Sequence, residues 1–532
     1  MPPPRTPAAT PPGFSQRLGG LLRRRAAASF TLDARSLAAY RIGLGLLLLA
    51  DSLLRTRDFT LMFGPEGMLP LAAIADYFGG DSTSWSVACW RDAAWWGGAV
   101  LAAEGLAGLA LVAGWQTRLA TVVGWVALVS VVRRTGPTTN AGDLWLGCQL
   151  FWSMFLPLGE RWSLDARQRQ SNAFATDAGP TSRPAASVRS IASLALVLQL
   201  AAVYVGAGLA KCNPTWFEGE PVVHALSLHD HGKPLGTLLA EIPWLTRAAQ
   251  WGVLAGEIGL PLLLIAVPRP RVRGSLVTLF VGYHLVIWLT MTVGLFAPIG
   301  IVAWLPLIPG AFWPKEVSAG QPRVARLGRV ASWACGLAVG LAAVSFGHAV
   351  TPWRSRPLPR LIEASLNLTG LAQVWEMFAL VPPQEQWVYG RAVLADGSVV
   401  DILREGRPLE TVRPAGGFST LPHHRWHKFF WVLPWPRARV FAGPAAAALA
   451  RDWNERSPPA RRIESLEIRY VSQPVRDDQR AIRDTLIAAW PPRSPAGSGN
   501  LDRFLRRSDA TAGPASESPS SDASLTLLPP GR

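Results

Sequence analysis

The sequence predicts a polytopic α-helical membrane protein with a small C-terminal α+β extracytoplasmic module. Of its 532 residues, 49% are hydrophobic, only 17% are charged, and 24 are tryptophan. The apolar residues gather in repeated runs, as in chains that cross a bilayer several times and unlike those of large soluble enzymes. From about residue 353 the pattern changes to turn-rich, alternating segments that indicate strands.

Nine apolar runs are candidate membrane spans. They cover residues 36–54, 94–114, 117–132, 143–158, 191–210, 247–267, 272–295, 297–313 and 328–350. A bilayer core of about 30 Å requires roughly 20 helical residues, so several runs are short. The third, fourth and eighth runs are therefore the weakest predictions.

Basic residues in the connecting segments predict the orientation. With nine spans, the N-terminus and the segments after the fourth, sixth and eighth runs share one side and carry many arginines. Such segments face the cytoplasm, so we expect the N-terminus inside and the C-terminus outside. Arg133 and Arg134 violate this rule. The formal charge of +16 is explained by these segments, and the sequence has no basic, aromatic-interleaved stripe that predicts nucleic-acid binding.

We divide the chain into four parts. Residues 1–30 form a disordered basic cytoplasmic N-terminus, 31–350 the transmembrane domain, 351–490 the extracytoplasmic module, and 491–532 a disordered tail. The first apolar run is long enough to remain as an anchor, so we expect no cleavable signal peptide.

The module has three predicted elements. Residues 387–401 read as a β-hairpin with Asp396-Gly397 as its turn. Residues 444–456 read as a short helix, with Pro444 suited to the first position. Residues 463–471 alternate like a strand.

Ionisable side chains within apolar runs are the first candidates for a functional site, because they are costly in hydrocarbon. They are Arg41, Asp51, Glu104, Asp143, Glu257 and His284. In the predicted orientation Asp51, Asp143 and Lys211 lie toward the outer face, so a site built from them would open outward. Blander interpretations stay open: Asp51 reaches the interface, Glu104 and Glu257 hydrogen-bond a facing helix or Arg41, and His284 is a packing residue.

Lys211 follows directly on an apolar run, where the chain reads Tyr204 to Gly219. A lysine at the edge of hydrocarbon snorkels, finds a partner or loses its proton, and a neutral amine can act as a base. The alternative is that Lys211 only complements the negative end of its helix.

Metal chemistry is not predicted. His229-Asp230-His231 and the segment 423–427, which holds three histidines, have no established metal-ligand spacing, so we interpret them as surface loops. The four cysteines are far apart and form no CxxC pair.

An ordered set of motifs then resembles a known family. Its pieces are Arg41-Ile42-Gly43 through Asp51, Gly67-Met68-Leu69-Pro70, Asn140-Ala-Gly-Asp143, Trp162-Ser163-Leu164-Asp165, the Tyr204–Gly219 stretch, Tyr283-His284 and Trp375-x-Met377-Phe378. The set resembles HTTM-domain proteins, the bacterial relatives of vitamin K-dependent gamma-carboxylase, over roughly residues 33–480.

The resemblance implies a site and a chemistry. Lys211 would be the base that deprotonates a membrane quinol of the vitamin K type, and His284 would support it. The pocket would also contain Asp51, Asp143, Trp216, Glu218, Arg41 and Glu257. The implied partners are the lipid bilayer and a secreted or membrane polypeptide, and the implied location is a bacterial inner membrane. The chain has Gly159-Glu160-Arg161 where the animal carboxylases have an Asn-His pair.

Two functions remain open. The first is a quinol-linked, carboxylase-like or oxidoreductase enzyme. The second is a non-catalytic membrane scaffold, or a maturation or immunity factor, that docks a partner through its C-terminal module. A transporter is a weaker third candidate, because we find no internal repeat.

Overall fold

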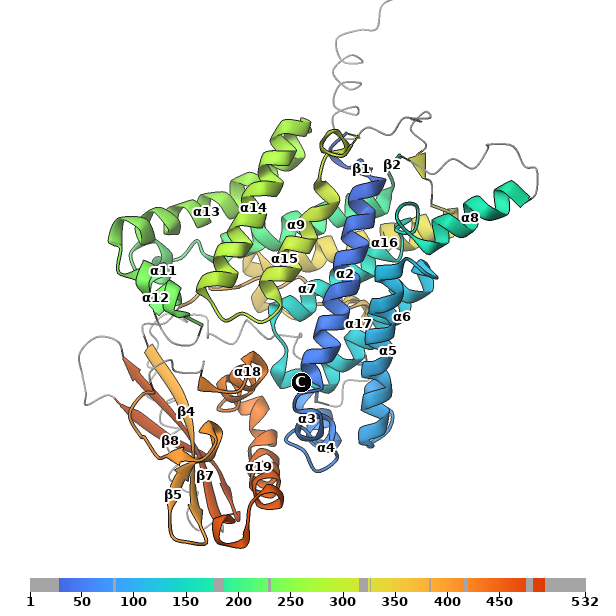
Figure 1. Cartoon of the computed structure of the whole chain (residues 1–532). Coiled ribbons are helices and arrows are strands. Elements are labelled where there is room, and N and C mark those ends of the chain that lie inside the picture. Colours follow the sequence, from blue (N-terminus) through green and yellow to red (C-terminus); the bar gives the residue numbers. More distant parts are fainter. Residues whose placement is uncertain are drawn as a thin grey trace, which may run out of the picture.

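The computed structural model describes residues 28–79, 83–175, 186–227, 231–314, 324–325, 327–381, 384–414, 420–474 and 482–492. The predicted disordered ends, 1–30 and 491–532, lie almost entirely outside the described residues, as does His229-Asp230. Figure 1 shows a large helical part and, beside one of its ends, a smaller module built from a sheet and helices.

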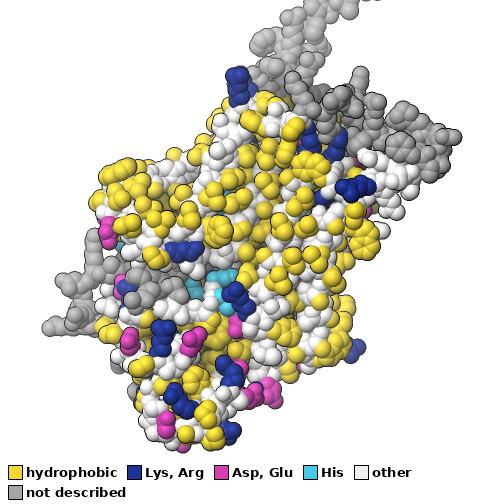
Figure 2. Space-filling view, in the orientation of Figure 1, with side chains coloured by type: hydrophobic (Ala, Val, Ile, Leu, Met, Phe, Trp, Pro, Cys, Tyr) yellow, Lys and Arg dark blue, Asp and Glu magenta, His cyan; other side chains and the backbone are white. Residues whose placement is uncertain are grey.

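Six helices in the described residues are long and apolar enough to cross a membrane, judged by length and composition. They are α2 (Ala34–Arg55), α5 (Ala94–Ala113), α9 (Ile191–Ala210), α13 (Pro243–Ala266), α14 (Pro270–Thr290) and α16 (Arg329–Ala349). Each coincides with a predicted span. Their exposed apolar surface is extensive: only 17% of the apolar window of α16 is buried, and Figure 2 shows hydrophobic side chains covering much of the helical part.

The three weakest predicted spans fold as helices that fall short of this standard. They are α6 (Thr117–Arg134), α7 (Ala141–Ser153) and α15 (Phe296–Trp304). Arginines lie at both ends of α6, and the 13 residues of α7 extend only about 20 Å. The count of nine spans is therefore not confirmed.

The spanning helices pack in a few defined pairs, with shorter elements between them. The α2 helix packs on α5, and α9 packs on both α13 and α16. A small sheet of β1 (Leu32–Asp33), β2 (Ser187–Val188) and β3 (Val324–Ala325) ties together the chain segments that lead into α2, α9 and α16. The shorter helices are α3 (Phe59–Phe63), α4 (Leu71–Tyr77), α8 (Leu164–Ala175), α10 (Pro214–Phe217), α11 (Pro221–Ser227), α12 (Pro234–Ala240) and α17 (Arg360–Thr369).

The two arginines that violate the positive-inside rule have a structural role. Both lie at the end of α6 and are buried. Arg133 donates to the carbonyl of Trp85 at 2.7 Å, and Arg134 donates to the carbonyl of Leu69 at 2.6 Å. Their guanidiniums therefore satisfy carbonyl groups of the segment between α2 and α5.

The module contains a five-stranded antiparallel sheet with the order β6-β5-β4-β7-β8. Its strands are β4 (Gln384–Leu394), β5 (Val399–Asp401), β6 (Arg407–Pro408), β7 (Ile463–Pro474) and β8 (Arg483–Trp490). The predicted hairpin is confirmed, with Gly397 at φ 80° in its turn, and so is the predicted strand, now part of β7. The predicted helix is α19 (Ala442–Arg456), which begins two residues before Pro444 and packs on β7 and β8.

The sequence did not predict β8 or α18 (His424–Val432). The α18 helix carries the histidine-rich segment that we interpreted as a surface loop, and that interpretation is wrong. Apolar residues at helical spacing, including Trp426, Phe429 and Phe430, bury one face of α18. The helix lies where the module meets the helical part (Figure 1).

Candidate functional site

Lys211 lies at the end of α9 and is buried, with 3% of its surface exposed. Its Nζ donates to Glu257 Oε2 at 2.9 Å and lies 5.5 Å from the centroid of the Trp216 ring. The Tyr283 hydroxyl donates to the other oxygen of Glu257, Oε1, at 3.0 Å. Lys211 therefore does not snorkel to water: it is held inside by an ion pair and an aromatic face.

Close packing of α9 on α13 makes this pair possible. Gly208 lies one turn before Lys211, and a Cβ atom there would lie 2.6 Å from a side-chain carbon of Ile258 and 3.2 Å from Cβ of Glu257. A larger residue would separate the two helices. Glycine at this position thus brings the carboxylate of one helix against the lysine of the other.

His284 belongs to a second hydrogen-bonded set beside the first. Its Nε2 lies 2.6 Å from the Tyr204 hydroxyl, which also accepts from Trp304 Nε1 at 2.8 Å. The imidazole is fully buried, and in the described part of the chain its Nδ1 has no hydrogen-bond partner. Tyr283 and His284 are neighbours on α14, so one helix orients both sets. The contacts do not include a direct hydrogen bond between His284 and Lys211.

A short segment before the sheet of the module covers the Trp216 side of this site. Trp216 Nε1 donates to the carbonyl of Phe378 at 2.9 Å, and Asn213 Nδ2 donates to the carbonyl of Ala379 at 3.0 Å. Phe378 has φ 55°, a left-handed conformation that is costly for a bulky residue. Trp216 is thus part of the Lys211 site, as expected, whereas Glu218 is exposed.

Asp51 and Asp143 form a different cluster, which corrects the expectation of one outward pocket with Lys211. Asp51 accepts from Arg55 Nε at 2.7 Å, and Asp143 lies 3.4 Å from Arg55 Nη2. Arg425 of α18 reaches both carboxylates: its Nη2 lies 2.5 Å from Asp51 and 3.2 Å from Asp143. All four side chains are buried, so two acids and two guanidiniums form a closed network.

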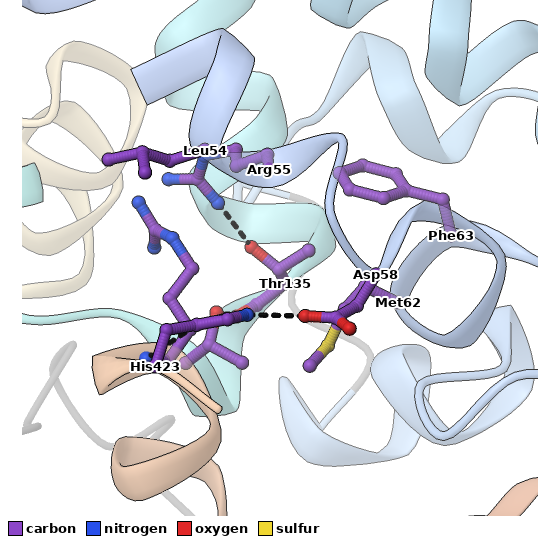
Figure 3. Close-up of a pocket in the computed structure, with 9 residues that line it drawn as sticks. Leu54, Arg55, Asp58, Met62, Phe63, Thr135 and His423 are labelled. Atoms are coloured by element: carbon purple, nitrogen blue, oxygen red, sulfur yellow. Dashed lines mark hydrogen bonds and ion pairs between the residues drawn. The ribbon is translucent and has the colours of Figure 1, made fainter. Parts of the chain in front are cut away.

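His423, the residue just before α18, adds a second contact between the module and the helical part. His423 pairs with Asp58, and Trp426 Nε1 donates to the same carboxylate at 2.9 Å. Figure 3 shows His423 reaching Asp58, and Arg55 reaching Thr135, around a small pocket. The pocket is lined by Leu54, Arg55, Asp58, Met62, Phe63, Thr135, Thr138, His423 and Arg425. None of the residues around Lys211 lines it.

Arg41 does not lie in the pocket expected for it, and Glu104 does not bond to it. Arg41 donates to the carbonyls of Leu158, Arg161 and Trp162, and it lies ten residues, or about 15 Å, along α2 from Asp51. Glu104 is fully buried beside Asp51 and so does not partner Arg41.

The turn that departs from the carboxylase pattern lies at the Arg41 end. The carbonyl of Gly159 accepts from Ser163, and that of Arg161 accepts from Arg41. The sheet strand β2, which leads into α9, also lies at this end, because β2 pairs with β1 just before α2. Lys211 is at the far end of α9, 20 residues and about 30 Å away. The departure at 159–161 therefore does not alter the surroundings of Lys211.

In the part of the chain that the structure describes, no group of three or more His, Cys, Asp or Glu side chains is arranged to hold a metal ion. The side chains that gather are instead paired acids and bases.

Comparison with known proteins gives one result. Residues 100–313 match the model of the HTTM domain. The match includes Asp143, Lys211, Glu257 and His284, and it excludes Arg41, Asp51 and the C-terminal module. No curated protein and no solved structure matches the chain.

Proposed function

The chain carries an HTTM domain, and on this basis we propose that it is a multi-pass membrane enzyme, carboxylase-like or an oxidoreductase, with Lys211 as its base. The observation that supports this most is the buried ion pair between Lys211 and Glu257. Burying an ammonium at the end of a membrane helix costs free energy. Ionisable groups that are kept inside membrane helices therefore mark functional sites.

The geometry offers a route to a neutral amine. Transfer of a proton from Lys211 to Glu257 across 2.9 Å removes both charges from a low-dielectric site. Tyr283 holds Glu257 in place by donating to its second oxygen. The neutral amine would then accept a proton from a substrate hydroxyl.

A quinol of the vitamin K type fits the residues present. When bound, it would supply an acidic hydroxyl and two electrons. Lys211 would take the hydroxyl proton, the Trp216 ring would supply an aromatic face, and the unpartnered Nδ1 of His284 would offer a hydrogen-bond site. Access from lipid is consistent with the exposed apolar surfaces of α13 and α14, which carry Glu257 and His284.

The test is quinol-dependent oxygen or carbon dioxide consumption by purified protein in lipid nanodiscs. Lys211→Met should lower the rate by about 10² or more, the typical contribution of a general base. Because Lys211→Met leaves Glu257 without its cation, the double variant with Glu257→Gln separates lost chemistry from lost folding. Lys233→Met is the matched control, since Lys233 donates to the carbonyl of Trp288 near the surface and makes no ion pair with another described residue. Full activity in folded Lys211→Met would refute the proposal.

The alternative is a scaffold or a maturation or immunity factor that docks a partner through its module. The anchoring of α18 by Arg425 favours a module with a fixed position on the helical part. A folded wild-type protein that shows no quinol-dependent consumption and captures a secreted polypeptide through residues 351–490 would support this alternative.

The proposed orientation places the Lys211 end and the module outside the cytoplasm of a bacterial cell. Cys212 is exposed, whereas Cys148 and Cys335 are buried. A membrane-impermeant maleimide added to intact spheroplasts should therefore label Cys212. Labelling of Cys212 only after lysis would reverse the orientation.

A further inference from the structure

Four basic side chains lie near one another where the module contacts the helical part, beside the Arg425 network and away from Lys211. The rings of His231 and His427 lie 4.9 Å apart. Lys428 follows His427 on α18, and its Nζ lies 4.0 Å from the centroid of the Trp431 ring. His424 lies one turn earlier against Gly294, where a Cβ atom would meet its ring at 2.6 Å. Histidine side chains reach the surface at this junction in Figure 2.

Two of the four basic groups, Lys428 and His424, are not matched by an acid of their own in the described part of the chain. Among the described residues Lys428 has no ion pair, and the His424 Nε2 is buried without a hydrogen-bond partner. Asp143 raises the pKa of Lys428, and Asp51 raises the pKa of His424. Both are already shared between the guanidiniums of Arg55 and Arg425.

Burial and mutual repulsion favour the neutral forms of these bases. Burial lowers the pKa of Lys428 to about 7, with Asp143 offsetting part of the effect. Burial lowers the pKa of His231 to about 4 and that of His424 to about 3. The pKa of His427 falls well below its usual value, first through burial and then through His231 and Lys428. An anion placed among them would reverse this by favouring the charged forms.

We propose that the cluster of His231, His424, His427 and Lys428 binds the carboxylate group of a ligand. Lys428 would supply the positive charge, and the imidazoles would supply hydrogen bonds. A carboxylate fits better than a phosphate because a second negative charge would face Asp51 and Asp143 in the layer beneath. The site is independent of the Lys211 chemistry.

The proposal predicts that binding is coupled to proton uptake. At pH 7 about half of the Lys428 side chains are neutral, so binding should take up about half a proton, and at pH 8 more than that. The dissociation constant for a carboxylate should rise by up to about tenfold per pH unit above pH 7. Asp143 acts on Lys428, and Lys428 in turn acts on His231 and His427, whose pKa values lie below this range.

Calorimetric titration of the full chain in nanodiscs at pH 6, 7 and 8 tests this, with acetate as the probe and acetamide as its neutral match. Acetate should bind, and acetamide should bind at least about tenfold more weakly. The heat of acetate binding should change with the ionisation enthalpy of the buffer, because the buffer supplies the protons taken up. N-acetylglutamate amide, run in parallel, shows whether a side-chain carboxylate fits as free acetate does.

Two variants of Lys428 and two controls decide the outcome. Lys428→Met should weaken acetate binding about tenfold or more, whereas Lys428→Arg should retain binding and lose its pH dependence, because arginine stays charged. Arg437→Met, an exposed cation elsewhere on the module, should change nothing, and Lys211→Met should leave this binding intact even if it abolishes activity. Equal binding of acetamide, unchanged proton uptake in Lys428→Arg, or tighter binding of inorganic phosphate would each overturn the proposal.

Discussion

Arg425 of the module forms ion pairs with two acids of the helical part, Asp51 and Asp143. The loss of stability on its removal can be worked out from these pairs. In Arg425→Met, the apolar volume stays similar while the guanidinium is lost. Asp51 and Asp143 then share only Arg55, which lies 2.7 Å from the first and 3.4 Å from the second. The network changes from two charges of each sign to a buried net charge of −1.

The expected cost follows from this imbalance. Breaking a buried pair by removing one partner destabilises a protein by about 3–5 kcal/mol, because an uncompensated charge remains. Arg55 still neutralises one carboxylate, so we expect the lower end of that range, about 3 kcal/mol. Adding Asp143→Asn restores one acid for one guanidinium, and the double variant should recover at least about 1 kcal/mol relative to Arg425→Met.

Unfolding of a membrane protein with a separate module need not be two-state, so local opening is the better measure. Hydrogen exchange at the amides of α18 and at the start of α7 should speed up about 10²-fold in Arg425→Met, the equivalent of about 3 kcal/mol. Arg437→Met is the control for a module cation that makes no buried pair. Unchanged exchange in Arg425→Met, or a double variant worse than the single one, would refute the reasoning.

Two further changes test other contacts. Gly300→Ala should destabilise the helical part by roughly 1–3 kcal/mol and displace His284, because the new Cβ would meet the His284 ring at 2.2 Å. The control Gly282→Ala has open space around it and should be neutral or stabilising by up to about 1 kcal/mol. Thermal unfolding of both variants checks this, and equal melting temperatures would contradict it. Burial raises the pKa of Asp58, but hydrogen bonds from His423 and Trp426 outweigh it and lower the pKa below its usual value. The stability from Asp58 is thus present above the unfolded pKa of about 3.9 and lost as pH falls through the folded pKa. Trp426→Phe should move that loss to higher pH in melting curves recorded from about pH 2 to 5.

The helical part was largely predictable because its signal is local. Twenty or so consecutive apolar residues identify a span without reference to the rest of the chain, and six such runs became long helices. The α6 and α7 helices were harder because packing against neighbours, and not length, makes them helical. Arg133 and Arg134 were exceptions to the loop-charge argument, and their partners are carbonyl groups, which sequence composition does not reveal.

The site was predictable in its residue types and not in its pairings. Lys211 and Glu257 stood out as charges in apolar runs, and the structure pairs them. Asp51 and Asp143 stood out equally, yet their partner Arg425 is 374 and 282 residues away in sequence. The composition of segment 423–427, with three histidines, suggested a solvent-exposed loop. The acids that pair with its side chains are distant in sequence, so only the tertiary fold reveals them.

The position of Arg425 outside the region that matches the HTTM domain has an evolutionary consequence. Arg425 of the module balances the charge of buried acids in the helical part. Without the module, these acids would outnumber the cations that neutralise them. Chains that share these helices but lack the module should not keep acidic residues at positions 51, 58 and 143 together, because Arg55 alone cannot balance all three. The module and this acidic trio should be gained and lost as one inherited unit, which an alignment of relatives with and without the module would reveal.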